Sequence, residues 1–187
     1  KTAENRPKRA GVKILCEVFP TLPREVFFRN LRGEGGADLR RSLLGFIEAY
    51  GLVGRDAALD ELDCELQRSD LITYYLRNLI YLLHRIPRES PETIDREFDA
   101  LTKASAPGNL IYVIKEAATA LGFIKSDASV KVLTTRLAEF EATLLRNDTS
   151  AYPAGEQQKL LDRLISALAR SGTSPALLPI ARTGSKS

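Results

Sequence analysis

Residues 111–133 read IYVIKEAATALGFIKSDASVKVL, and residues 40–62 read RRSLLGFIEAYGLVGRDAALDEL. When the two stretches are aligned without a gap, most apolar positions stay apolar and several residues are identical, among them Gly51 and Gly122, Asp56 and Asp127, and Ala57 and Ala128. A third copy, residues 77–96, lies almost midway between them. A helix, a small or Gly/Pro break, a polar cap and a second helix, recurring about every 35 residues, are typical of stacked helical hairpins.

The first helices are delimited by proline, aspartate and glycine. Pro23 is at a position that favours the start of a helix over residues 24–31, because its missing N–H has no partner there anyway. The pattern then predicts Asp38 as the N-cap of a helix over residues 39–50, which Gly51 ends.

The next pairs repeat this pattern. Helices are predicted over residues 56–68, 71–86, 93–103, 109–121 and 127–145. The second of these is apolar almost all round, which is typical of an interior helix. Pro87 ends it, Ser90-Pro91 and Ser126 cap later helices, and Gly122 is expected to end the helix before it. A longer loop over residues 147–156 precedes the last copy, 158–180, where Ser174-Pro175 repeats the cap. No segment alternates like a strand, so we expect an all-α fold of about ten helices.

The segments around the two aligned glycines resemble the second helix and terminal glycine of HEAT repeats. They are residues 40–51 and 115–122, and the Asp-Ala pairs that begin at Asp56 and Asp127 resemble the start of the following repeat. The resemblance covers about residues 38–180. It implies a HEAT-like α-solenoid of stacked antiparallel hairpins, a family that most often scaffolds and binds proteins, sometimes binds nucleic acid and in a few cases processes damaged DNA.

The chain departs from the HEAT pattern in three places: Pro87 replaces the glycine, the 147–156 loop is long, and the N-terminal segment does not fit the period. We expect one helical domain over residues 11–182, a basic arm over 1–10 and a tail over 183–187. The chain starts at Lys1 and contains no methionine, so the sequence is interpreted as part of a longer protein or as lacking some residues.

Composition narrows the functional classes. Apolar residues make up 44% of the 187 and charged residues 27%, which is typical of a soluble folded protein. No apolar run reaches the roughly 20 residues of a membrane span, and no secretory signal is visible. Two distant cysteines, Cys16 and Cys64, and one histidine make a disulfide framework or zinc site improbable. The cysteines are interpreted as small buried hydrophobes, and a cytoplasmic location is expected.

Charge alternates along the chain. Residues 1–50 carry ten Lys/Arg against six Asp/Glu, residues 51–104 seven against eleven, and residues 105–187 ten against seven. A nucleic-acid-binding domain more often has a continuous basic stripe. Basic residues of the N-terminus and second helices could nevertheless follow phosphates, so nucleic-acid binding remains the alternative function.

The aligned second helices predict one partner-binding face, because solenoids usually present these helices on their concave side. Its members are Arg41, Arg77, Asn78, Tyr81, Tyr112 and Lys115. Tyrosine and arginine dominate binding hot spots, so Tyr81 and Tyr112 are the expected aromatic anchors and Arg41 and Arg77 the charged ones. In the competing interpretation, the tyrosines fill gaps between repeats and the arginines pair with nearby carboxylates.

No constellation of residues supports catalysis. His84 is interpreted as a helix-terminal histidine that contacts carbonyl groups. The segment 32–37 (RGEGGA) lacks the Lys-Ser/Thr of a phosphate loop and reads as a turn, and the acidic helix 56–68 reads as a solvated outer face. The sequence therefore predicts a non-catalytic protein-interaction or scaffolding module that binds a protein or peptide, with no cofactor, metal, membrane or small-molecule substrate.

Overall fold

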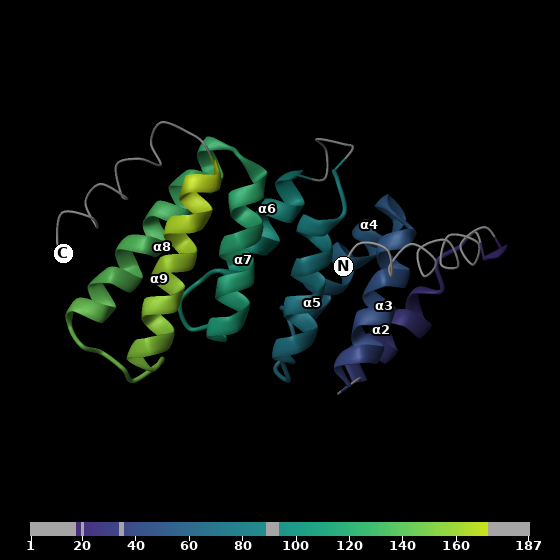
Figure 1. Ribbon diagram of the computed structural model, residues 1–187, viewed down its shortest axis with the longest axis horizontal. Coiled ribbons are helices and arrows are strands. Elements are labelled where there is room, and N and C mark those ends of the chain that lie inside the picture. The colour runs from purple at the N-terminus through teal and green to yellow at the C-terminus, as the bar shows by residue number, and fades with distance from the viewer. Residues whose placement is uncertain (1–17, 20, 34–35, 89–93, 172–187) are drawn as a thin grey trace, which may run out of the picture. The chain divides into compact units, whose positions relative to one another are not determined.

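The structure is a computed structural model that describes residues 18–19, 21–33, 36–88 and 94–171. These residues form helices joined by short loops (Figure 1). Within those residues there is no strand, and the eight helices are α2 (Arg24–Gly33), α3 (Ala37–Ala49), α4 (Leu52–Glu65), α5 (Thr73–Arg85), α6 (Ile94–Ala104), α7 (Ile111–Ile124), α8 (Asp127–Leu145) and α9 (Ala154–Ser171). The all-α prediction is confirmed. No described helix combines the length and apolar character that a bilayer crossing needs.

The chain divides into two compact units, Lys1–Glu89 and Ser90–Ser187, and unit 1 contains two helical hairpins. In the first, α2 packs on α3 and the Phe27 ring lies 5.7 Å from that of Phe46. In the second, α4 packs on α5 and the Tyr75 hydroxyl donates to Glu61 at 3.0 Å. Each contact joins the start of one helix to the end of the other, so both hairpins are antiparallel. α3 also packs against α4 and α5.

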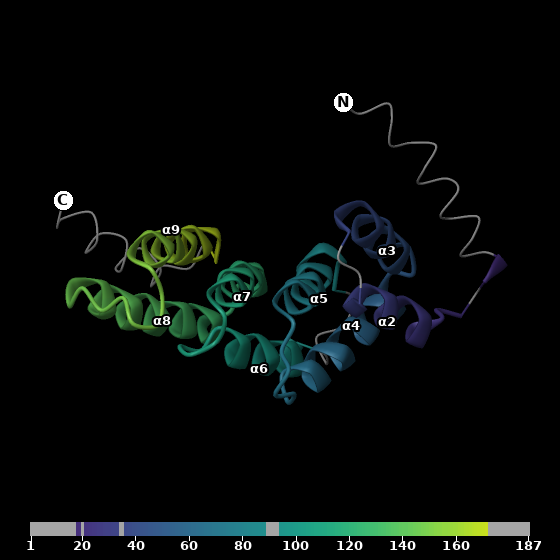
Figure 2. The same cartoon turned by 90° about the horizontal axis from the view of Figure 1, so that it is seen from below.

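Unit 2 repeats this organisation with α6–α7 and α8–α9. Figure 2 shows α7 and α9 in one layer of the unit and α6 and α8 in the other. α7 packs on α6, α8 and α9, and α8 packs on α9. In both units the second helices of the hairpins, α3 with α5 and α7 with α9, therefore lie side by side.

The two aligned glycines have different structural roles. Gly51 has a φ of 56° and its N–H bonds to the Glu48 carbonyl, so it ends α3 as predicted. Gly122 does not end its helix: α7 continues to Ile124, and Lys125 adopts the left-handed conformation after it. A Cβ on Gly122 would lie 2.8 Å from the Ala167 carbonyl oxygen of α9. Gly122 is therefore required by close helix packing.

Two further predicted boundaries are wrong. Asp38 does not cap α3, because the helix begins at Ala37 after Gly36, and the Asp38 carboxylate bonds Arg41 instead. α4 begins at Leu52, four residues before Asp56, because Gly51 already serves as its N-cap position. The repeat alignment therefore matches residues that begin α8 to residues inside α4.

Other local signals are confirmed. Pro23 accepts the first helical bond of α2 from the Phe27 N–H at 3.1 Å. Ser126 caps α8 through a reciprocal pair of hydrogen bonds with Ser129. α5 ends at Arg85, two residues before Pro87. The arm over 1–10, the tail over 183–187, Cys16 and the caps at Ser90 and Ser174 lie outside the described residues.

The predicted interior position of α5 is correct for one side of the helix only, because Arg77 and Arg85 on its other side are exposed. Leu79, Ile80 and Leu83 are fully buried. Cys64 contradicts its prediction, since it is exposed on α4. The single domain over residues 11–182 and the count of ten helices stay predictions.

Candidate functional site

α3 and α5 run parallel in unit 1, and side chains on the surface that they share contact each other near both ends of the pair. The Arg40 guanidinium lies 5.1 Å above the centre of the Tyr74 ring near the start of both helices. Near their ends, Glu48 accepts a hydrogen bond from Tyr81 and lies 3.5 Å from the Arg85 guanidinium. We call this surface the α3–α5 face; its members are Arg40, Arg41, Glu48, Tyr74, Arg77, Tyr81 and Arg85.

The two predicted charged anchors lie on this face. Arg41 is on α3, its side chain 77% exposed, and it pairs with Asp38 of its own helix at 2.9 Å. Arg77 is exposed on the neighbouring α5. The cross-helix contacts join residues 33 to 37 positions apart, and the separation of Arg41 and Arg77 falls in the same range.

Tyr81 bridges the two helices in addition to lining the surface. Its ring packs edge-on against His84, with centroids 5.5 Å apart. Burial and the Glu48 carboxylate raise the pKa of the Tyr81 phenol above its ordinary value, so the hydroxyl stays protonated and donates to Glu48. Tyr81 is therefore half-buried where α3 and α5 meet, and its role as an aromatic anchor stays a prediction.

Asn78 lies beside Arg77 on α5 and is half-buried. Its Nδ2 is buried and has no hydrogen-bond partner among the described residues. Nothing in the structure explains this unpaired donor.

The remaining predicted residues belong to α7 of unit 2. Tyr112 is 48% exposed, and the Lys115 ammonium lies 5.3 Å from the centre of its ring. Lys115 itself is largely covered and pairs with Glu156 of α9 at 2.5 Å, and Lys159 binds the same carboxylate at 2.8 Å. Hydrogen bonds from these two lysines lower the pKa of Glu156 to about 2. Lys115 therefore ties α7 to α9, while Tyr112 is the accessible member of the pair.

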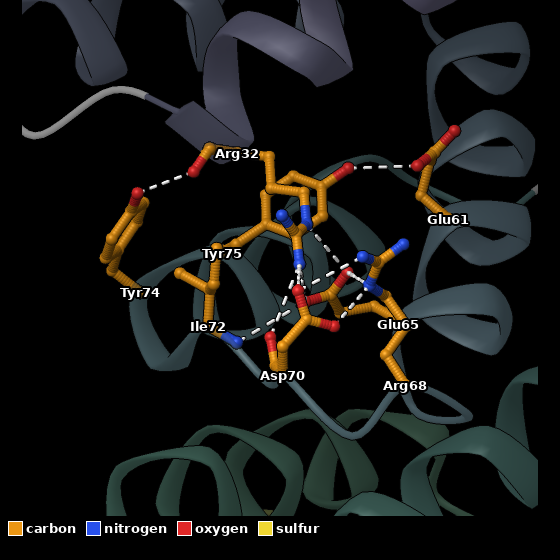
Figure 3. Close-up of polar contacts among 8 residues, drawn as sticks. All are labelled: Arg32, Glu61, Glu65, Arg68, Asp70, Ile72, Tyr74 and Tyr75. Atoms are coloured by element: carbon orange, nitrogen blue, oxygen red, sulfur yellow. Dashed lines mark hydrogen bonds and ion pairs between the residues drawn. The ribbon is translucent and has the colours of Figure 1, made fainter.

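Sequence reasoning missed a polar network that connects α2 to the α4–α5 turn (Figure 3). Glu65 is only 3% exposed and accepts bonds from Arg32 Nε at 3.1 Å and from the Ile72 N–H at 3.3 Å. Arg32 also binds Asp70 at 3.0 Å, and Arg68 binds Asp70 at 2.9 Å. Hydrogen bonds from Arg68 and Arg32 hold the pKa of the Asp70 carboxyl well below its ordinary range.

The same network fixes the first turn of α5. Tyr74 donates to the Arg32 carbonyl at 2.5 Å, and this bond holds the ring that Arg40 covers. Tyr75 is buried and donates to Glu61, and burial together with that carboxylate raises the pKa of its phenol far above the ordinary value. Tyr74 therefore connects the polar network to the α3–α5 face.

The weaker candidates have structural partners. His84 Nδ1 lies 3.2 Å from the Ile80 carbonyl one turn back within α5, whereas the prediction placed the ring at the free carbonyls of the helix end. On the acidic helix, Asp60 pairs with Arg24 of α2 at 2.7 Å. Together with Glu61 and Glu65, it is therefore a structural carboxylate, and the interpretation of α4 as a purely solvated face is incomplete.

Comparisons of the chain with family models, with curated proteins and with solved structures gave no match.

Proposed function

We propose that this chain is a non-catalytic protein-interaction module, a HEAT-like α-solenoid that acts as a scaffold in the cytoplasm. The proposal is supported by a division of roles in unit 1. The polar network joins α2 to the α4–α5 turn, whereas the α3–α5 face exposes Arg41, Arg77 and Arg85 and carries the half-buried Tyr74 and Tyr81. These two residue types dominate protein-binding hot spots.

Site-specific photo-cross-linking in the native cell tests the proposal. A photoreactive amino acid at position 41 or 77 should cross-link a partner protein. The same substitution at Asp56 of α4 or Lys131 of α8, which are also exposed, should not. No protein adduct at positions 41 and 77, or equal adducts at all four, would count against the proposal.

Nucleic-acid binding is the alternative, and the basic character of α3 and α5 supports it. Phosphate contacts release counterions, so such binding weakens steeply as salt rises. A titration of single-stranded RNA against the chain in low and in physiological salt decides whether it occurs. No binding in low salt, or binding that salt does not change, would remove this alternative.

A further inference from the structure

Contacts between α7 and α9 define a second surface, which belongs to unit 2 (Figure 2). Near the start of both helices, Lys115 of α7 pairs with Glu156 of α9. Near their ends, the Arg170 guanidinium of α9 lies 4.6 Å from the centre of the Phe123 ring of α7. The two helices therefore run parallel, and side chains from both meet near each end of the surface that they share.

Arg163 lies on the same surface, between these two contacts. It is seven residues from both Glu156 and Arg170, and residues seven apart share one side of a helix. Arg163 is exposed and has no ion-pair or hydrogen-bond partner among the described residues. No described carboxylate pairs with Arg170 either, and its Nη1 is buried without a hydrogen-bond partner. Two guanidinium groups on this surface are therefore without a carboxylate in the part of the chain that the structure describes.

The other charged groups leave this surface with a positive surplus. Lys115 and Lys159 both bind Glu156, so these three groups together carry one positive charge. Asp162 directly precedes Arg163, and adjacent residues of a helix do not face the same side. We call the shared surface the α7–α9 face; its charged members are Lys115, Lys159, Arg163 and Arg170 against Glu116 and Glu156. A positive face attracts a negative partner and raises the rate at which the two meet.

Two aromatic rings of α7 add apolar surface to this face. Tyr112 is 48% exposed and Phe123 is 39% exposed. They are about three helical turns apart, so they lie on one side of α7 and roughly 16 Å from each other. The Lys115 ammonium lies 5.3 Å from the centre of the first ring, and the Arg170 guanidinium covers the second. Each ring therefore adjoins a positive charge.

We infer that the α7–α9 face binds an acidic peptide segment of a partner protein. The planar guanidinium of Arg163 matches a carboxylate with two parallel hydrogen bonds, and the rings of Tyr112 and Phe123 offer apolar contact on either side of it. An extended segment of roughly five residues spans the distance between the rings. The inference rests on the proposed function in that the partner is a protein, and it adds a surface in unit 2 with a stated partner chemistry.

A nucleic acid fits the same face less well. Proteins that follow a phosphate backbone make roughly six to ten phosphate contacts along a basic track. Here Lys115 and Lys159 are held by Glu156, so only the two guanidinium groups of α9 are left for phosphates. A short acidic segment needs no more than these two.

The test is selection of phage-displayed random peptides on the full chain, with subtraction against the Arg163→Glu variant. Enriched peptides should be rich in Asp and Glu. They should bind Arg163→Glu at least about tenfold more weakly than the parent chain, because charge reversal turns an attraction into a repulsion. The matched control is Lys131→Glu, which reverses one exposed charge of α8 and should bind the peptides as the parent does. If circular dichroism shows that Arg163→Glu is unfolded, Arg163→Gln replaces it, with a loss of several-fold expected.

A second pair of variants tests the apolar part of the face. Tyr112→Ala should weaken binding of the same peptides about fivefold or more, because a buried tyrosine is a frequent hot spot of binding. Leu145→Ala, which shortens a side chain that is 67% exposed at the end of α8, should leave binding unchanged. Equal affinities of these two variants would remove Tyr112 from the site.

The other outcomes overturn the inference in different ways. Peptides that need Arg163 but are not acidic would overturn the acidic class. Acidic peptides that lose equal affinity for Arg163→Glu and Lys131→Glu would show attraction to the overall charge and overturn the face as their site, and so would an absence of enriched peptides. Binding of single-stranded poly-U RNA that is tighter than that of any enriched peptide, and that Arg163→Glu abolishes, would assign the face to nucleic acid. In each case the proposed function is decided separately, by the cross-links at positions 41 and 77.

Discussion

At the scale of single residues, glycine permits two close contacts between helix backbones. A Cβ on Gly122 would lie 2.8 Å from the Ala167 carbonyl oxygen, and one on Gly54 would lie 2.2 Å from the Ile47 carbonyl oxygen. Both partners are backbone atoms, which cannot rotate away as a side chain can. A methyl group at either position therefore requires the neighbouring helix to move.

Gly122→Ala should lower the free energy of unfolding by about 1–3 kcal/mol, the usual cost of overpacking, even though alanine favours helix more than glycine does. Gly45→Ala is the matched control, since a Cβ there meets nothing within 4 Å in the middle of α3. That change should raise the unfolding free energy by up to about 1 kcal/mol. Urea denaturation of both variants measures the contrast, and equal effects would contradict the packing role of Gly122.

Glu65→Gln removes the negative charge that pairs with Arg32, and the Glu65 side chain is almost fully buried. Removing one member of a buried pair typically costs several kcal/mol, and Asp70 still holds Arg32, so a loss of about 3 kcal/mol is expected. Glu25→Gln is the control: Glu25 is 92% exposed and lies 3.8 Å from Arg29, so the change should cost less than about 0.5 kcal/mol. Similar urea midpoints for the two variants would show that the network does not stabilise unit 1.

At the scale of helices and their connections, local signals predict much of the structure. Pro23, Ser126 and Pro87 act through their own backbone or the adjacent turn, and each has its predicted effect. Alignment of Gly51 with Gly122 misled the prediction, because sequence does not distinguish a glycine chosen for its positive φ from one chosen for its lack of a side chain.

The polar network was missed for a different reason. Its ion pair joins residues 33 positions apart, and pairing at that separation depends on how hairpins pack. One local sign was available: Arg55, Ala58, Leu62 and Glu65 recur at helical spacing, and all four are buried. A charged residue that continues an apolar stripe indicates a buried pair.

α5 provides a test of interior packing. Leu79 is fully buried in this helix, so Leu79→Ala should lower the free energy of unfolding by about 2–5 kcal/mol. Leu145→Ala at the exposed end of α8, where the side chain is 67% exposed, should change it by less than about 0.5 kcal/mol. Chemical denaturation measures the free energy of unfolding of both variants. A small loss for Leu79→Ala would contradict the burial of this side of α5.

The contact between α7 and α9 should depend on pH through Glu156. The carboxyl has a pKa of about 2 in the folded chain and 4.5 ordinarily, so on acidification the unfolded chain binds the proton first. Its contribution to stability is complete above pH 4.5 and disappears as the pH falls toward 2. Glu156→Gln should therefore reduce the loss of stability between pH 5 and pH 3, measured by urea denaturation. An unchanged loss would contradict the lysine contacts of Glu156.

At the scale of the whole molecule, the chain is built from two compact units, each with two hairpins and each with buried apolar helices. We expect a fragment of residues 90–187 to fold alone, with a helical circular dichroism spectrum and a cooperative thermal transition, because its length is sufficient for an independent core. A fragment that is unfolded would favour the single array over residues 11–182, in which each repeat requires its neighbour.

The Gly122 contact also decides how α7 and α9 are joined along their length. Near their C-terminal ends the two backbones touch without an intervening side chain. Near their N-terminal ends the Lys115–Glu156 ion pair joins them. The first contact contains no titratable group and the second does, so acidification acts on the attachment of α9 at the end beside Tyr112.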